Sequence, residues 1–161
     1  MANLTVTLTE SVTLNGSARG STNTLTISGV DDIFHRIITV PAGTSNLTLV
    51  SFTNEMTDRD GALDRDLVKY IRVTNLDASN PVILNLQQRE DEHASSVGDQ
   101  NAGILLSATK SFILGEAADS IDVEGGANDI DATTDLHDLE SIMVDPLAAE
   151  VKVEVFIALV V

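Results

Sequence analysis

The 161-residue chain carries 25 acidic and 9 basic residues, and its formal net charge of -16 disfavours contact with nucleic acid or an anionic membrane surface. It has no cysteine, which excludes a disulfide framework and a thiolate metal site. A length of 161 residues suits a single domain over residues 1–161. Hydrophobic residues make up 43% of the chain and aromatic ones only 3%, so we expect its core to be aliphatic.

The first third of the sequence predicts a series of short strands. Residues 4–14 carry apolar side chains at the even positions, with Glu10 as the exception, and threonine or serine at the odd ones. This period of two is typical of a half-buried strand. Asn15-Gly16 then predicts a tight turn. Further strands are predicted at residues 24–28, 33–40 and 47–52.

Two apolar runs with a period of two flank a cluster of turn formers in residues 68–88. Asn75 and Asp77 have side chains that close turns on their own backbone, and Pro81 restricts the residue before it to an extended conformation. We therefore predict a β-hairpin, or a tightly connected strand pair, in this stretch.

The second half of the chain alternates polar segments with strands. Residues 89–103 are polar and end in glycine, whereas residues 104–114 return to strand character. Residues 116–145 contain ten acidic residues and no lysine or arginine, and we expect them on the surface because so many like charges cannot be buried together. A last strand pair is predicted at residues 141–144 and 150–161.

The end of the last strand is apolar at every position from 156 to 161. A strand that is apolar on both faces is either central in a sheet or part of an interface. The candidate contact residues for such an interface, with a second copy or another protein, are Phe156, Ile157, Leu159 and Val161.

About ten short strands, polar turns and no long helix predict an all-β protein. The expected architecture is an antiparallel β-sandwich, with the jelly roll as its expected type. Its predicted core residues are Leu4, Val6, Leu8, Ile71, Val73, Val82, Leu84, Leu86, Phe112, Val153 and Val155.

Residues 58–66 have the composition of a calcium-binding loop, since hard cations such as Ca²⁺ favour carboxylate oxygens. The spacing does not match an EF-hand, because Met56 stands where a ligand is needed, and two arginines in the loop could neutralise its charge. A single glycine-rich motif at 125–131 lacks the further copies that a calcium-binding repeat requires. A solvated loop is therefore the preferred interpretation, no cofactor is expected, and the weak metal candidates are Asp58, Asp60, Asp64 and Asp66.

No arrangement of residues predicts catalysis. The histidines are His35, His93 and His137, and none of them has the spacing of a hydrolytic triad with a nucleophile elbow. His35 lies inside a predicted strand, where a structural or interface role is usual. We therefore do not expect an enzyme.

Strand-and-turn patterns extend over nearly the whole chain, at residues 4–30, at RIITVP (36–41), at KYIRVTNLDASNPVILNL (69–86), at SFILG (111–115) and in the terminal strand. Together they resemble those of small virion proteins of tailed bacteriophages, especially marine and cyanobacterial phages. The resemblance implies a β-sandwich on the particle surface, either a capsid decoration (cement) protein or part of a head or tail appendage. It also implies assembly rather than catalysis.

From this resemblance we expect a decoration protein on the outer face of the capsid shell, with the major capsid protein or other virion proteins as partners. Its acidity fits the outer surface of the virion, because packaged DNA would repel it. We expect assembly in the host cytoplasm and a homo-oligomer, by analogy a trimer. The alternative is an appendage adhesin, in a head fibre or tail, that binds a host-surface glycan or protein.

The acidic segment yields a first prediction. Replacing Glu116, Asp119 and Asp122 with their amides is expected to leave the melting temperature almost unchanged, because exposed substitutions usually alter stability by less than about 0.5 kcal/mol. Thermal unfolding followed by circular dichroism tests this. A large loss of stability would show that these carboxylates are paired inside the protein.

Overall fold

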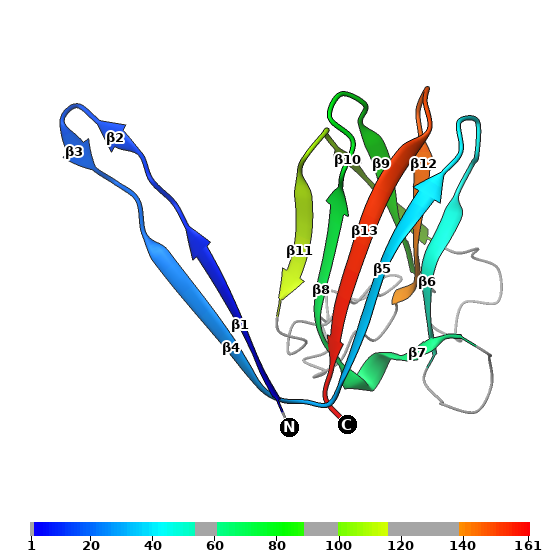
Figure 1. Cartoon of the computed structure of the whole chain (residues 1–161), viewed down its shortest axis with the longest axis horizontal. Helices are drawn as coiled ribbons and strands as arrows, with labels where there is room; N and C mark the ends of the chain where they lie inside the picture. The colour runs from blue at the N-terminus through cyan, green and yellow to red at the C-terminus, as the bar shows by residue number, and fades with distance from the viewer. Residues whose placement is uncertain (1, 54–60, 89–99, 116–138) are drawn as a thin grey trace, which may run out of the picture.

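The computed structural model describes residues 2–53, 61–88, 100–115 and 139–161. They form two β-sheets packed face to face, and a long hairpin projects from one end of this sandwich (Figure 1). The all-β sandwich predicted from the sequence is confirmed. Among the described residues the only helix is the three-residue 3₁₀ turn η1 (Arg65–Leu67), and no helix there could cross a membrane.

The sheet nearer the viewer in Figure 1, here called the front sheet, has four antiparallel strands. Their order is β11 (Ser111–Gly115), β8 (Val68–Asn75), β13 (Val151–Leu159) and β5 (Asp32–Val40). The other sheet, the back sheet, has the order β10 (Gln100–Leu106), β9 (Val82–Gln88), β12 (Leu139–Pro146), β6 (Leu47–Thr53) and β7 (Leu63–Asp64). Among the strands of the described residues, only the short β7 pairs in parallel.

Most consecutive strands of the sandwich lie in opposite sheets. β8 pairs with β11 and β13, and β9 pairs with β10 and β12, so the hairpin pairing predicted for residues 68–88 is wrong. The predicted pairing of the last two strands is wrong for the same reason, because β12 and β13 belong to different sheets. The predicted strand at residues 104–114 is the end of β10 followed by β11. A period of two marks a strand but does not identify its neighbours.

A buried asparagine holds the corner where the chain crosses from β8 to β9. The Asn75 side chain donates to the carbonyl oxygens of Asn80 at 2.8 Å and Leu106 at 3.2 Å, and it accepts the N–H of Asp77 at 3.0 Å. The Asp77 carboxylate accepts the N–H groups of Asn80 and Ser79, which lowers the pKa of Asp77. These bonds tie the end of β8 to its turn and to the end of β10 in the back sheet.

The core between the sheets is aliphatic, as predicted. Strand β9 and the second half of β8 contribute alternate side chains to it, and the predicted core positions Val153 and Val155 of β13 are completely buried. Phe112 packs against this core while partly exposed. The other largest fully buried side chains are Ile71, Leu84, Leu139, Ile142, Ile157, Val40, Val68, Val73, Val82, Val144 and Val151.

Residues 2–30 form a separate arm and do not belong to either sheet of the sandwich (Figure 1). β1 (Ala2–Thr9) pairs with β4 (Thr22–Val30), and the short strands β2 (Thr13–Leu14) and β3 (Ser17–Ala18) continue the ribbon to its tip. Asn15 and Gly16 close it with φ values of 50° and 76°, as a type I′ turn requires. Leu8 is 56% exposed, and Leu4 and Val6 are partly buried outside the core between the sheets, so the predicted core positions of all three are wrong.

The base of the arm packs on the outer face of the front sheet. Ile27 and Val30 of the arm are buried together with Tyr70 of β8 and Ala158 of β13. A side chain at Gly115 in β11 would stand 3.3 Å from Leu25 of β4, so glycine permits this close approach. We call this group the arm cluster; its partly buried members are Leu4, Val6, Leu25, Phe156 and Val160.

The two faces of the back sheet provide a matched test of the core. Leu84 is completely buried, whereas Leu105 on the neighbouring strand is 62% exposed. We expect Leu84→Ala to lower the free energy of unfolding by about 2–5 kcal/mol, and Leu105→Ala to change it by less than about 0.5 kcal/mol. Chemical denaturation measures both. Equal losses would contradict the assignment of the two faces.

Candidate interaction surfaces

Of the four candidate metal ligands, the structure describes Asp64 and Asp66. Asp64 is the N-cap of η1, where its Oδ1 accepts the backbone N–H of Asp66 at 3.1 Å. Asp58 and Asp60 lie outside the described residues, as do the glycine motif at 125–131, His93 and His137. Within the described ranges, no three His, Cys, Asp or Glu side chains come together as a metal site would require. The structure therefore gives Asp64 a capping role, and the solvated loop stays the prediction for residues 58–66.

The four interface candidates in the last strand have different environments. Ile157 and Leu159 are 0% and 5% exposed in the core between the sheets, so they are not available for contact with a partner. Phe156 lies on the opposite face of β13 in the arm cluster. Val161, beyond the strand, is 80% exposed. The end of the strand is apolar on both faces because it is central in the front sheet and because the arm base covers its outer face there.

A charged cluster occupies the outer face of the front sheet beyond the arm base. His35 Nε2 lies 2.8 Å from Glu154 Oε1, and Arg72 Nη1 donates to Glu154 Oε2 at 2.7 Å. Phe156 supports both partners, with its ring centroid 5.7 Å from that of His35 and 5.8 Å from the Arg72 guanidinium carbon. The hydrogen bonds from His35 and then from Arg72 hold the pKa of Glu154 below its usual value.

Isoleucine side chains flank this cluster at both edges of the sheet. Ile113 of β11 pairs with Arg72 and is 46% exposed. Ile37 of β5 pairs with Glu154 and is 60% exposed. The outer face of the front sheet is therefore apolar at its edges and charged at its centre.

The two sheets also differ in charge. The front-sheet strands contain four basic residues and two acidic ones, a net charge of +2 in a chain of -16. The back-sheet strands contain three acidic residues and no basic one. The front-sheet charges are Arg36, Lys69, Arg72, Lys152, Asp32 and Glu154, and those of the back sheet are Asp64, Glu140 and Asp145.

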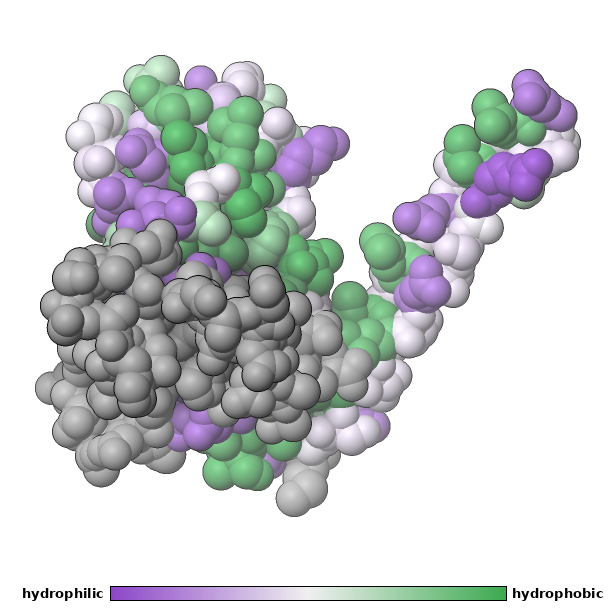
Figure 2. Space-filling model, turned by 180° about the vertical axis from the view of Figure 1, so that it is seen from behind, coloured by the Kyte–Doolittle hydropathy of each residue, from purple (hydrophilic) through white to green (hydrophobic). Residues whose placement is uncertain are grey.

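The outer half of the arm is a second exposed surface. Leu8, Val12 and Leu14 are 56%, 53% and 60% exposed, and Figure 2 shows hydrophobic side chains at intervals along the arm. The arm as a whole is neutral, because residues 2–30 contain one acidic and one basic residue, Glu10 and Arg19. Neutral charge and exposed leucine and valine are properties of a contact surface rather than of a solvated loop.

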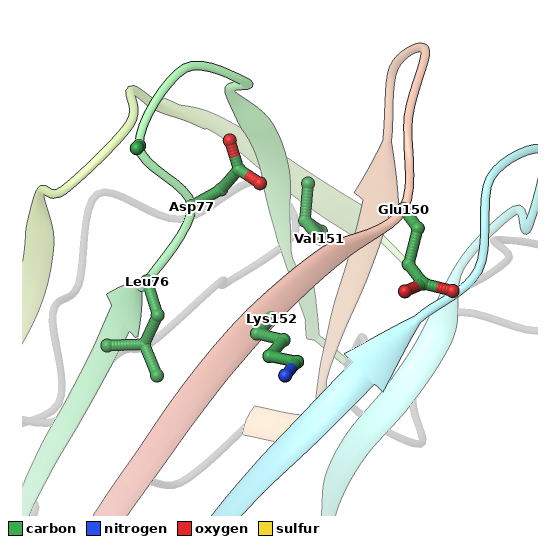
Figure 3. Close-up of a pocket in the computed structure, with 6 residues that line it drawn as sticks. Leu76, Asp77, Glu150, Val151 and Lys152 are labelled. Carbon is green, nitrogen blue, oxygen red and sulfur yellow. The ribbon is translucent and has the colours of Figure 1, made fainter.

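A hollow of about 210 Å³ lies at the end of the sandwich where the β8–β9 corner meets the start of β13. Figure 3 shows the Asp77 carboxylate inside its own loop and the Lys152 ammonium well away from it. The hollow is open and smaller than the roughly 300–1,000 Å³ typical of small-molecule sites. Asp77 and Lys152 are not placed to bind one ligand together in this hollow.

Comparison with known proteins adds no assignment to these surfaces: no protein-family model, curated protein or solved structure matches this chain.

The sequence analysis did not identify the arm, although a signal for it was present. The ribbon keeps one register around Asn15-Gly16, from the pair Leu14 and Ser17 to the pair Asn3 and Ser28. Two alternating runs placed symmetrically about a type I′ dipeptide predict a single long hairpin. The charged cluster had no such signal, because His35 and Glu154 are separated by 119 positions.

The charged cluster yields a pH-dependent prediction. Glu154→Gln is expected to lower the free energy of unfolding by about 1 kcal/mol at pH 7, because it removes two charge-assisted hydrogen bonds. The folded pKa is below the unfolded value of about 4.3, so this stabilisation is complete above that pH and is lost as the pH falls through the folded pKa. Urea titrations at several pH values should show the two proteins converging below about pH 4.

Glu150→Gln is the matched control, since it changes an exposed carboxylate four positions earlier in the chain. It should have a small effect that varies little with pH. If the cost of Glu154→Gln were the same at pH 3 as at pH 7, the Glu154 charge would not be its source.

Proposed function

We propose that this protein is a structural component of a tailed-bacteriophage virion, a decoration protein that binds the outer face of the capsid shell. The observation that carries the proposal is the arm, a neutral ribbon with exposed Leu8, Val12 and Leu14 that extends away from the sandwich (Figure 1). Such a ribbon can reach a neighbouring protein and bury apolar surface against it. The strand-and-turn resemblance to virion proteins supports the same role.

We further infer that the sandwich is of the jelly-roll type. Counted along the chain from β5 and without the short β7, the eight main strands are ordered 1-8-3-6 in the front sheet and 2-7-4-5 in the back sheet. Two sheets of four strands with this alternation are what two Greek keys produce, and viral capsid proteins commonly have this architecture.

Charge supports a position on the outer surface. A protein with a net charge of -16 would be repelled by packaged DNA inside a shell. The basic residues of the front sheet give one side of the sandwich a different character from the acidic back sheet. An acidic partner would therefore bind more favourably to the front-sheet side of the sandwich than to the back-sheet side.

The aromatic residues favour decoration over the alternative of a glycan-binding adhesin. Glycan sites use exposed aromatic rings as platforms, and all five aromatic residues of this chain are in the described ranges. Phe52 and Tyr70 are buried, and the other three, Phe34, Phe112 and Phe156, are partly buried. None of them forms an exposed platform.

The proposal is tested on virions of the phage that encodes the chain. We expect mass spectrometry of purified particles to detect the protein in a fixed ratio to the major capsid protein, and cryo-EM to place it on the outer surface. Particles that lack the protein would contradict the proposal. Density confined to a tail or head fibre would instead favour the appendage alternative.

Purified protein added to particles stripped of it provides a second test. A shortened-arm variant, in which residues 10–21 are replaced by Asn-Gly so that Thr9 and Thr22 stay paired, should bind at least about tenfold more weakly in a sedimentation assay, because the arm's link to a neighbour is lost. The Leu105→Ala variant, altered on the exposed face of the back sheet, is the control and should bind as the wild type does. Equal binding of all three proteins would show that the arm has no part in attachment.

A further inference from the structure

The arm and the front sheet form one apolar contact within the chain, the arm cluster. On both the arm and the sheet, apolar side chains extend beyond this contact and are exposed. Leu4 and Val6 of the arm belong to the arm cluster on the front sheet. Leu8 comes next on the same face of β1, because alternate residues of a strand share a face. It is 56% exposed. The contact face of the arm therefore extends past the point where its own sheet covers it.

The outer face of the front sheet also has apolar side chains beyond the part that the arm covers. Tyr70 and Ala158 are covered by the arm base, and the next rows of the outer face contain Phe156, Ile113 and Ile37. Ile113 and Ile37 are 46% and 60% exposed. Figure 1 shows the arm diverging from the sandwich as it extends, so its tip does not return to this face of its own sheet.

Charge restricts what can occupy these two surfaces. Two copies of a chain with a net charge of -16 repel each other over most of their surfaces. The arm has a net charge of zero, and the outer face of the front sheet presents Arg72 and Lys152 against Glu154, so an arm placed on it is a contact without this repulsion. A second copy supplies both surfaces at once.

We propose that copies of this chain associate by arm exchange, with the outer half of each arm lying on the outer face of the next copy's front sheet. Leu8, Val12 and Leu14 then pack against the face that contains Ile113, Phe156 and Ile37. The contact extends the arm cluster across the copy boundary, and repetition around a closed ring leaves no arm and no front sheet uncovered. The inference rests on the assembly role proposed above for the arm and identifies its partner as the same chain.

The test compares three aspartate variants of the full chain by sedimentation velocity at micromolar concentration. Leu14→Asp alters the arm, Ile113→Asp alters the front sheet, and Leu105→Asp is the control at a position of the back sheet that is at least as exposed as either. We expect the wild type and Leu105→Asp to form a closed oligomer, and the other two to dissociate at least tenfold more readily. Circular dichroism verifies that each variant is folded.

Mixing the two defective variants distinguishes arm exchange from other contacts. In an equal mixture, the intact arm of Ile113→Asp meets the intact sheet of Leu14→Asp, so mixed assemblies should form at concentrations where neither variant associates alone. A monomeric wild type would overturn the proposal. So would an Ile113→Asp variant that associates normally, because the arms would then contact each other and not the sheet.

Sedimentation velocity, read together with the virion experiments above, separates this inference from the proposed function. A monomeric protein that still binds virions would exclude arm exchange and leave the decoration role intact. An arm-exchanged oligomer that is absent from virions would do the reverse.

Discussion

The apolar end of the last strand has to be covered on both faces, and much of the structure depends on this requirement. β13 is central in the front sheet, and Ile157 and Leu159 fill the core between the sheets. Its other face presents Phe156 and Ala158, which would be exposed in an isolated sandwich. The arm base covers them with apolar side chains from β1 and β4, and burial of this kind contributes roughly 25 cal/mol for each Å² removed from water. The apolar contacts that cover the end of the last strand therefore also anchor the base of the arm on the sandwich.

This anchorage explains why the arm begins on the front sheet and then leaves it. The ribbon keeps one register from the pair Asn3 and Ser28 to its tip, so it stays a single hairpin whether or not a sheet lies beneath it. Its inner half is held by the arm cluster, and its outer half lies beyond the cover of the sandwich (Figure 1). A neutral exposed ribbon on a strongly acidic protein is the feature from which we infer an assembly role.

The crossing from β8 to β9 depends on a polar group that is satisfied inside the protein. Asn75 is completely buried, and an amide in that environment is costly unless it is hydrogen-bonded. Its bonds to Asn80, Asp77 and Leu106 join two strands of opposite sheets at one corner. A polar side chain with this many partners specifies the crossing geometry more strictly than an apolar side chain of similar size would.

The sequence by itself determined the local features of this protein: the strands, the turns at Asn15-Gly16 and Asn75–Pro81, and the aliphatic core at positions such as Ile71 and Leu84. These follow from backbone preferences and from a period of two, which act over a few neighbouring residues. Only the tertiary structure decided that β8 pairs with β13, that Leu8 is exposed and that His35 meets Glu154. A period of two shows which face of a strand is apolar, but what covers that face depends on residues far away in the chain.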